Sequence, residues 1–252
     1  MRKNVLITGA SSGLGAGMAR ILAEKGHNLA LTARRVDRLE ALKAEIEAAH
    51  PDVDVVVLPL DVNDHDQVFT VFKQAIRELG GLDRVIVNAG LGKGGRIGTG
   101  KFYANKETAE TNFIAALAQC EAAMEHFYER QAGHLVVISS VSAMRGLPSA
   151  VTTYAATKAA VAHLAEEIRA DLAKRKGHDI KVTTLFPGYI ASEMNEGVEQ
   201  EIRLMVDTET GCRAMIKAID REVAESAIPP WPWSPLSQFM KHAPLSVLRR
   251  MM

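Results

Sequence analysis

The feature that most constrains this chain is a glycine-rich turn that directly follows a short apolar stretch near its beginning. Val5-Leu6-Ile7 is predicted to form a strand, Thr8-Gly9-Ala10-Ser11-Ser12-Gly13-Leu14-Gly15 forms the turn, and a helical pattern follows at Ala16–Lys25. Glycines allow a tight turn, and the start of a helix offers unpaired N–H groups to an anion. The spacing is G-x-x-x-G-x-G rather than the commoner G-x-G-x-x-G. The order predicts a pyrophosphate site, with a turn that binds no ligand as the alternative.

Strand and helix patterns alternate along the chain. Apolar runs that favour strands lie at Val5–Thr8, Asn28–Ala33, Asp54–Pro59, Arg84–Asn88, His134–Ser139 and Lys181–Phe186. Helical patterns lie between them, at Ala16–Lys25, Val36–Ala49, Asp64–Leu79, Lys106–Arg130 and Thr153–Lys176. Continuous apolar strands that alternate with helices indicate a parallel sheet covered on both faces. Right-handed crossovers then favour an α/β fold with a doubly wound, three-layer αβα sandwich, which we expect as a single domain over residues 1–228.

Composition is consistent with one enzyme domain. The 252 residues are 47% hydrophobic, which is enough for a sizeable core. Thirty basic and thirty acidic residues cancel, so no nucleic-acid partner is expected. Two cysteines, Cys120 and Cys212, argue against a disulfide framework and favour a reducing, cytoplasmic compartment. The early first strand leaves no room for a signal peptide, and no apolar run approaches membrane-spanning length.

The ends of the predicted strands carry residues suited to a nucleotide. Ala33-Arg34-Arg35 follows the second strand, where a site selective for NAD commonly has a carboxylate. Guanidinium groups suit a 2′-phosphate instead, because they are permanently charged and bind it with bidentate geometry. Asp61-Val62 follows the third strand and could accept from an adenine amino group, while Asn88-Ala89-Gly90 follows the fourth and leaves space for a ribose. A solvated helix start and ordinary turns are the alternatives, but together these ends favour NADP.

A tyrosine and a lysine lie four residues apart after the fifth strand. That strand ends in Ile138-Ser139-Ser140, and Tyr154 and Lys158 share one face of the next helix. A neighbouring ammonium favours the phenolate, so we expect Lys158 to lower the pKa of Tyr154 toward a range useful for acid/base catalysis. An isolated pair with this spacing is usually an exposed surface pair. Its occurrence one loop after a strand-end serine, in a chain with a nucleotide turn, favours catalysis.

These residues resemble the short-chain dehydrogenase/reductase family, specifically its compact single-domain branch with a Rossmann-type fold. The resemblance spans about Lys3 to Met194. It rests on the turn at 8–15, Asn88-Ala89-Gly90, Asn112, Ser140, Tyr154, Lys158 and Pro187-Gly188-Tyr189-Ile190.

The resemblance implies a role for each site residue. Tyr154 would be the general acid/base, Ser140 would bind the substrate oxygen, Lys158 would hold the nicotinamide ribose, and Asn112 would position a proton-relay water. No metal is expected. The residues implied or expected to bind the cofactor are Gly9, Ser11, Ser12, Gly13, Leu14, Gly15, Arg34, Arg35, Asp61, Val62, Asn88, Ala89, Gly90, Tyr154, Lys158, Pro187, Gly188, Ile190 and Ser192.

The sequence departs from the family pattern at three points. Ser140 lies fourteen residues before Tyr154, one more than expected, so Ser139 and Ser142 remain candidates for its role. The extra residue is expected within Ser149–Thr153. Val87 precedes Asn88 where a second asparagine is frequent, and Ser192 stands where a threonine is usual, keeping a hydroxyl for the cofactor.

The predicted function is an NADP(H)-dependent oxidoreductase that transfers a hydride between nicotinamide and a carbonyl or secondary alcohol. An apolar ketone or a 3-oxoacyl-type substrate is favoured, because the segment from Ser192 to Thr208, with Met194, Ile202, Leu204, Met205 and Val206, is rather apolar. Simple packing of these side chains is the alternative. The loop Leu91–Gly100 is expected to help shape the pocket. The rival functions are an inactive NADP-binding sensor or scaffold, which needs no acid/base residue, and a dehydratase or epimerase, which usually carries an added domain.

The C-terminal tail, residues 229–252, is unusual in composition. Pro229-Pro230-Trp231-Pro232-Trp233-Ser234-Pro235 holds both tryptophans, and Leu236–Met252 has three Lys or Arg residues and no acid. We expect this tail to pack near the substrate entrance, on its own domain or on a partner subunit of a homodimer or homotetramer. Contact with a membrane surface and capture of a lipid substrate are the alternatives. Pro244 interrupts any single long helix.

Overall fold

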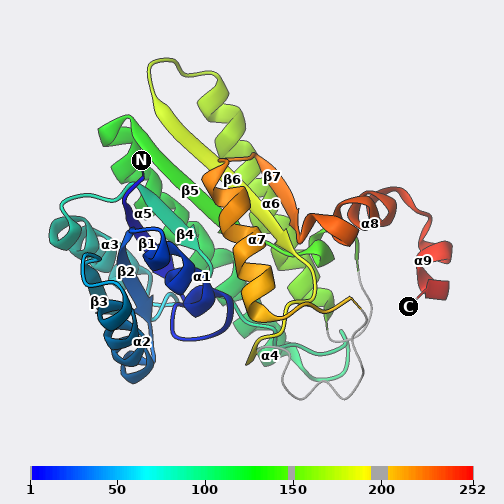
Figure 1. Cartoon of the computed structure of the whole chain (residues 1–252). Helices are drawn as coiled ribbons and strands as arrows, with labels where there is room; N and C mark the ends of the chain where they lie inside the picture. Colours follow the sequence, from blue (N-terminus) through cyan, green and yellow to red (C-terminus); the bar gives the residue numbers. More distant parts are fainter. Residues whose placement is uncertain (1, 147–150, 194–203, 252) are drawn as a thin grey trace.

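The computed structural model describes residues 2–146, 151–193 and 204–251. In this part of the chain, one parallel sheet has the strand order β3-β2-β1-β4-β5-β6-β7 (Figure 1). The strands are β1 (Asn4–Thr8), β2 (Asn28–Ala33), β3 (Val55–Pro59), β4 (Arg84–Val87), β5 (Ala132–Ile138), β6 (Asp179–Pro187) and β7 (Glu225–Ile228). All six predicted strands form. The seventh, β7, was not predicted, because it is a four-residue edge strand whose Glu225 and Ser226 are not fully buried.

Helices cover both faces of the sheet, which confirms the doubly wound, three-layer sandwich. The helices of the described residues are α1 (Gly13–Glu24), α2 (Val36–Ala49), α3 (His65–Leu79), α4 (Phe102–Ala109), α5 (Ala115–Arg130), α6 (Thr152–Ala173), α7 (Thr208–Asp220), α8 (Pro230–His242) and α9 (Leu245–Met251). Helices α1, α2 and α7 share one core with Val5 and Ile7 of β1, while α3, α5 and α6 share the other with Leu6. The alternation of side chains along a strand explains how one apolar strand serves both cores.

The strand order reverses beside β1, which pairs with β2 on one side and β4 on the other. Ligands of open parallel sheets bind beyond the carboxyl ends of the strands at such a switch point. Here the glycine turn after β1 meets the end of β4: the Asn88 side-chain amide donates to the Thr8 carbonyl at 2.8 Å, and the Asn88 backbone N–H donates to Thr8 Oγ1 at 3.0 Å. The switch point therefore joins two of the predicted strand-end sites.

The predicted helix at Lys106–Arg130 contains an unexpected turn. Between α4 and α5, residues Glu110–Ile114 form a π-helical turn, η1, which carries Asn112. Such turns occur frequently at functional sites, because they change the direction of side chains within a continuous helix.

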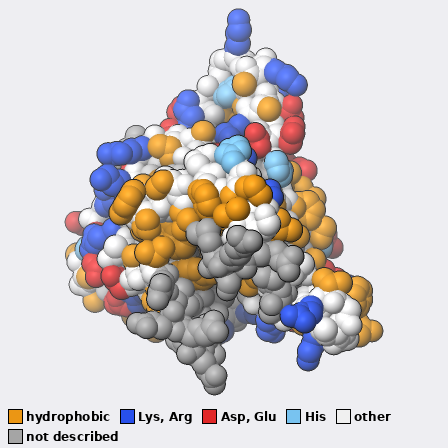
Figure 2. All heavy atoms as spheres, turned by 90° about the vertical axis from the view of Figure 1, so that its right-hand side faces the viewer, with side chains coloured by type: hydrophobic (Ala, Val, Ile, Leu, Met, Phe, Trp, Pro, Cys, Tyr) orange, Lys and Arg blue, Asp and Glu red, His pale blue; other side chains and the backbone are white. Residues whose placement is uncertain are grey.

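The C-terminal tail forms the helices α8 and α9, separated at Ala243 and Pro244. Helix α8 packs against β7 and against the 3₁₀ turn η2 (Val141–Met144). Its tryptophans differ: Trp233 is only 4% exposed, whereas Trp231 is 78% exposed within the single chain, so contact of Trp231 with a partner subunit stays a prediction. Figure 2 shows hydrophobic side chains gathered on the side of the molecule where α8 and α9 lie. The buried ring of Trp233 packs α8 against the rest of the domain.

Candidate active site

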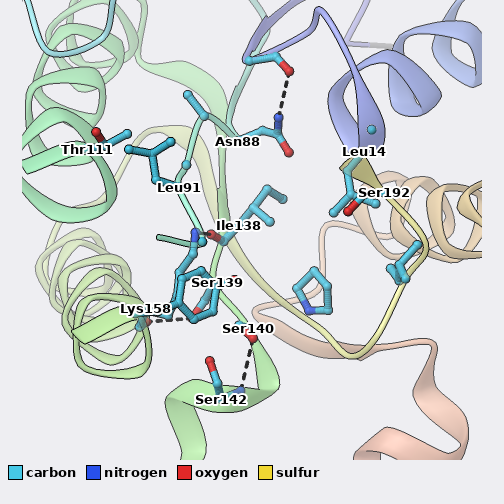
Figure 3. A pocket seen from close by; sticks show the side chains of 18 of the residues that line it. Leu14, Asn88, Leu91, Thr111, Ile138, Ser139, Ser140, Ser142, Lys158 and Ser192 are labelled. Atoms are coloured by element: carbon cyan, nitrogen blue, oxygen red, sulfur yellow. Dashed lines mark hydrogen bonds between the residues drawn. The ribbon is translucent and has the colours of Figure 1, made fainter. Parts of the chain in front are cut away.

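A cavity of about 900 Å³ lies beyond the carboxyl ends of the strands. It is lined by every predicted catalytic and cofactor-binding residue except Gly15 and Asn112. Figure 3 shows part of its wall, with Leu14 and Ser192 on one side and Ser139, Ser140 and Lys158 across from them. The fold therefore brings residues from positions 9 to 192 into one cavity.

The glycines of the turn stand at positions that disfavour a side chain. Gly9 and Gly13 have φ values of +66° and +51°, a region that favours glycine. A Cβ on Gly15 would lie 2.3 Å from the Gly9 carbonyl oxygen and 2.9 Å from the Asn88 amide nitrogen. Gly15 thus shapes the turn from beneath rather than lining the cavity. Bare backbone beside the start of α1 fits a cofactor pyrophosphate.

Two arginines, Arg34 and Arg35, line the cavity just after the end of β2. The Arg35 guanidinium donates to Ser11 Oγ at 3.2 Å and to Ser12 Oγ at 2.6 Å, which fixes it over the glycine turn. In the part of the chain that the structure describes, Arg34 makes no side-chain hydrogen bond or ion pair. Asp61, after β3, also lines the cavity and accepts from the Asn63 N–H at 3.1 Å.

Glu193 is a cavity residue that the sequence analysis missed. Its carboxylate accepts from Arg35 NH1 at 2.9 Å and also from Arg38. Hydrogen bonds from these two guanidinium groups hold the pKa of Glu193 at about 2. No local signal could have revealed the pairing, since 158 residues separate Glu193 from Arg35.

Ser140 and Tyr154 meet where β5 ends and α6 begins. Their side chains form a hydrogen bond, and Ser140 Oγ also accepts from the Ser142 N–H at 3.2 Å (Figure 3). Ser139 instead donates to the Lys158 carbonyl oxygen at 2.7 Å, so its hydroxyl serves to fix α6. Among the three candidate serines, Ser140 is the one that faces the tyrosine hydroxyl.

Burial controls the acid strength of Tyr154. Desolvation raises the pKa of its hydroxyl, and the hydrogen bond from Ser140 only partly opposes this effect. The expectation that Lys158 lowers the pKa of Tyr154 therefore does not hold in this structure. The reason is geometric: the Lys158 ammonium donates to the Ile138 carbonyl at 2.8 Å and lies 5.8 Å from the centre of the tyrosine ring.

Lys158 is itself strongly perturbed. Its side chain is buried, and desolvation lowers its pKa from 10.5 to about 8. A Cβ placed on Gly90 would lie 3.5 Å from the Lys158 nitrogen and 3.2 Å from Asn112 Oδ1, so both side chains reach the turn after β4. An amine with this pKa can take up and release a proton near neutral pH.

Asn112 lies behind the cavity wall rather than in it. Its Oδ1 accepts from the Leu91 N–H at 2.7 Å, and its amide donates to the Leu91 carbonyl at 2.9 Å and to Thr157 Oγ1 at 3.3 Å. These contacts bind the loop after β4 to α6. The described contacts of the Asn112 side chain therefore position Leu91.

The far end of the cavity is apolar, and residues of α8 form part of its wall. The ring of Trp233 lies on Gly188, where a Cβ would come within 2.1 Å of it, and meets Tyr189 edge to face at 5.7 Å. Further apolar lining comes from Leu204, Leu236, Phe239, Met240 and Leu248. Leu91 and Gly92 of the predicted loop also line the cavity.

Other apolar residues that were expected to shape the substrate pocket do not line the cavity in the described part of the chain. Met205 is 45% exposed, and Val206 packs against the core instead. Met194 and Ile202 lie outside the described residues. So does Ser149, the first residue of the stretch in which the extra residue between Ser140 and Tyr154 is expected.

The chain matches known families and structures over most of its length. A family model described as short chain dehydrogenase matches residues 3–203. The chain belongs to the short-chain dehydrogenase family. An uncharacterized oxidoreductase of Mycobacterium tuberculosis is 53% identical over 249 residues, 99% of this chain and 97% of that protein. The 3-oxoacyl-[acyl-carrier-protein] reductase of Staphylococcus aureus is 31% identical and covers 81% of this chain and 80% of its own.

Solved structures of the family share the fold and bind nicotinamide cofactors. An alcohol dehydrogenase from Thermococcus sibiricus, complexed with 5-hydroxy-NADP, has a TM-score of 0.78 at 27% identity and covers 89% of this chain and 95% of its own. A family member from Burkholderia phymatum in complex with NAD has a TM-score of 0.83 at 20% identity, over 99% and 95% of the two chains, which shows the fold alone. This short-chain dehydrogenase is thus an oxidoreductase of a family whose members include both NAD and NADP complexes. None of the helices in its described part is long and apolar enough to span a membrane.

Proposed function

We propose that this protein is an NADP(H)-dependent reductase of apolar ketones or 3-oxoacyl-type substrates. The observation that carries the proposal is the hydrogen-bonded pair of Ser140 and Tyr154 between the two halves of one cavity. On one side lie the glycine cradle and the arginines, and on the other the apolar wall that includes Trp233. The reductase relative from Staphylococcus aureus supports an acyl-type substrate.

The chain's own groups account for the proton chemistry. When bound, a nicotinamide cofactor supplies or accepts the hydride. In reduction, Tyr154 donates its proton to the substrate oxygen while Ser140 hydrogen-bonds the same oxygen and stabilises its growing negative charge. The raised pKa of Tyr154 keeps its hydroxyl protonated near neutral pH, which suits a proton donor. The reverse reaction uses the same residues with the proton moving toward Tyr154.

Lys158 and Asn112 act from behind this pair. With a pKa of about 8, Lys158 can replace the proton that Tyr154 gives up. Asn112 holds the loop that faces the Lys158 ammonium, and in this proposal the same turn orders the water that links the ammonium to solvent.

The end of β2 supports the choice of NADP. Ala33 ends the strand in place of a carboxylate, and Arg34 and Arg35 follow it in the cavity wall. A 2′-phosphate would find two permanent positive charges there, whereas a free ribose hydroxyl pair would find no acceptor among these three side chains.

Cofactor affinity provides the first test. Fluorescence titration of the whole protein should show tighter binding of NADPH than of NADH, and Arg34→Ala should remove most of the difference. Charge-assisted contacts of about 1.5–3 kcal/mol correspond to roughly a ten- to hundredfold preference. Arg77→Ala, on the exposed side of α3, is the matched control. Equal dissociation constants for both cofactors in the wild type would contradict the proposed preference.

Turnover tests the substrate class. NADPH oxidation should be faster with apolar ketones and 3-oxoacyl thioesters than with short polar ketones. Tight NADPH binding without turnover of any carbonyl in such a panel would favour the sensor or scaffold function instead.

A further inference from the structure

The carboxylate of Glu193 occupies an anion site at the mouth of the cavity. Arg35 and Arg38 of the α2 region donate to its two oxygens, and Ser12 of the glycine turn forms a further hydrogen bond with it. Arg35 is held in place at the same time by Ser11 and Ser12. Two guanidinium groups and a hydroxyl around one anion form a set of donors that also suits a phosphate monoester.

Glu193 reaches this site from a distant part of the chain. It follows β6, and the same segment is anchored by a hydrogen bond from Ala191 N–H to the Val206 carbonyl at 2.9 Å and by one from Thr208 Oγ1 to the Ala191 carbonyl at 2.6 Å. A Cβ on Gly13 would lie 3.3 Å from the Ser192 Cβ, which places this segment directly over the glycine turn. The backbone contacts of Ala191 and Ser192 therefore hold the Glu193 carboxylate close to Arg35.

We infer that Glu193 is a specificity-determining residue that competes with the 2′-phosphate of the cofactor for Arg35. The inference rests on the proposed use of NADP(H). A second anion near Arg35 must either displace the Glu193 carboxylate or be repelled by it, because both need the same guanidinium N–H groups. A cofactor without a 2′-phosphate does not need these N–H groups of Arg35. Glu193 thus lowers the affinity for NADP(H) but not that for NAD(H), and so reduces the difference in affinity between the two cofactors.

The ion pair is partly exposed, so its effect on affinity is moderate. The side chains of Arg35 and Glu193 are 42% and 40% exposed, and exposed ion pairs are weakened by solvent and salt. Removal of the Glu193 charge abolishes its ion pairs with Arg35 and Arg38 and its repulsion of a 2′-phosphate. Together these effects correspond to a change of about three- to tenfold in the dissociation constant of a ligand that carries this phosphate. This change is smaller than the preference expected from the arginines themselves.

The test measures binding of cofactor fragments rather than activity. Calorimetric titration of the full chain with 2′,5′-ADP and with 5′-ADP compares a ligand that has the 2′-phosphate with one that lacks it. Glu193→Gln should strengthen binding of 2′,5′-ADP about three- to tenfold and leave 5′-ADP unchanged, with a smaller gain at high salt. Glu45→Gln is the matched control, because Glu45 pairs with Arg20 at 2.6 Å away from the cavity lining.

The outcomes separate this inference from the proposed function. A gain for 2′,5′-ADP alone supports the competition, even if the wild type were to bind both fragments equally and so contradict the NADP preference. A wild type that prefers 2′,5′-ADP, together with an unchanged or weakened Glu193→Gln variant, retains the NADP preference and overturns the competition. An equal gain for both fragments also overturns it, since Glu193 would then only restrict access to the cavity.

Discussion

At the residue scale, burial sets the proton affinities of the two central side chains. Desolvation penalises the charged form of both Tyr154 and Lys158: the pKa of Tyr154 rises and that of Lys158 falls to about 8. The two groups thereby become less similar in proton affinity than their free side chains, because the pKa of Tyr154 rises above 10.0 while that of Lys158 falls from 10.5 to about 8. Transfer of a proton from the Lys158 ammonium to a Tyr154 phenolate is therefore more favourable than it would be between the free side chains in water.

Removal of the tyrosine hydroxyl tests this assignment. Tyr154→Phe should reduce the turnover number for carbonyl reduction by about 10²–10⁴-fold, because the proton donor is lost. NADPH affinity should stay close to that of the wild type, since the ring remains. Tyr128→Phe serves as the control, because that ring contacts Arg175 away from the cavity. If Tyr154→Phe kept most of its turnover, another group would have to be the proton donor.

At the scale of elements, α8 adds an apolar wall to the cavity at the carboxyl ends of the strands. Trp233 packs on Gly188, directly after β6, while Leu236, Phe239 and Met240 continue the apolar wall. The helix contacts β7 and η2, so one element connects the sheet edge with the turn that follows Ser140. Specificity for an apolar substrate is therefore expected to depend on this helix.

The two tryptophans of α8 provide a matched comparison. Trp233→Ala should lower the free energy of unfolding by about 3–5 kcal/mol, because a large buried ring leaves a cavity. Trp231→Ala should change it by no more than about 0.5 kcal/mol, since that ring is 78% exposed. Urea denaturation followed by circular dichroism measures both values. Similar losses for the two variants would show that exposed Trp231 is covered in solution, for example by a second subunit.

At the scale of the whole molecule, burial of Lys158 in the candidate active site lowers the free energy of unfolding. The fold encloses the Lys158 ammonium with a backbone carbonyl as its described hydrogen-bond acceptor, and this burial lowers its pKa from 10.5 to about 8. Between these values the unfolded chain binds a proton that the folded chain does not. The contribution of Lys158 to the free energy of unfolding therefore rises with pH across that window, and its penalty is complete below about pH 8.

This linkage can be isolated by comparing two proteins that differ only at Lys158. Lys158→Met should be stabilised relative to the wild type at pH 7, and the advantage should shrink by on the order of 3 kcal/mol toward pH 10.5. Urea unfolding at a series of pH values measures the difference. Lys73→Met, on an exposed position of α3, controls for loss of a lysine. A difference that does not vary between pH 7 and 10.5 would contradict the burial of a charged Lys158.

The sequence by itself determined the parts of this protein that depend on local pattern and chain order. Apolar strands alternating with helices imply a doubly wound sheet, and a glycine turn after the first strand implies a cradle at its end. The four-residue spacing of Tyr154 and Lys158 placed both on one helix face. The predicted strand-end residues consequently gathered at the switch point, as the cavity lining shows.

Only the tertiary structure decided contacts between distant segments. Which serine faces Tyr154 depended on the path of the chain after β5, and the side-chain role of Asn112 depended on Leu91. Glu193 reached Arg35 across 158 residues, and Trp233 of α8 packed on Gly188. Hydrophobic periodicity and turn composition carry no information about such pairings, because they arise when packing brings remote side chains together. Burial, which shifted the proton affinities of Tyr154 and Lys158, likewise exists only once the chain has folded.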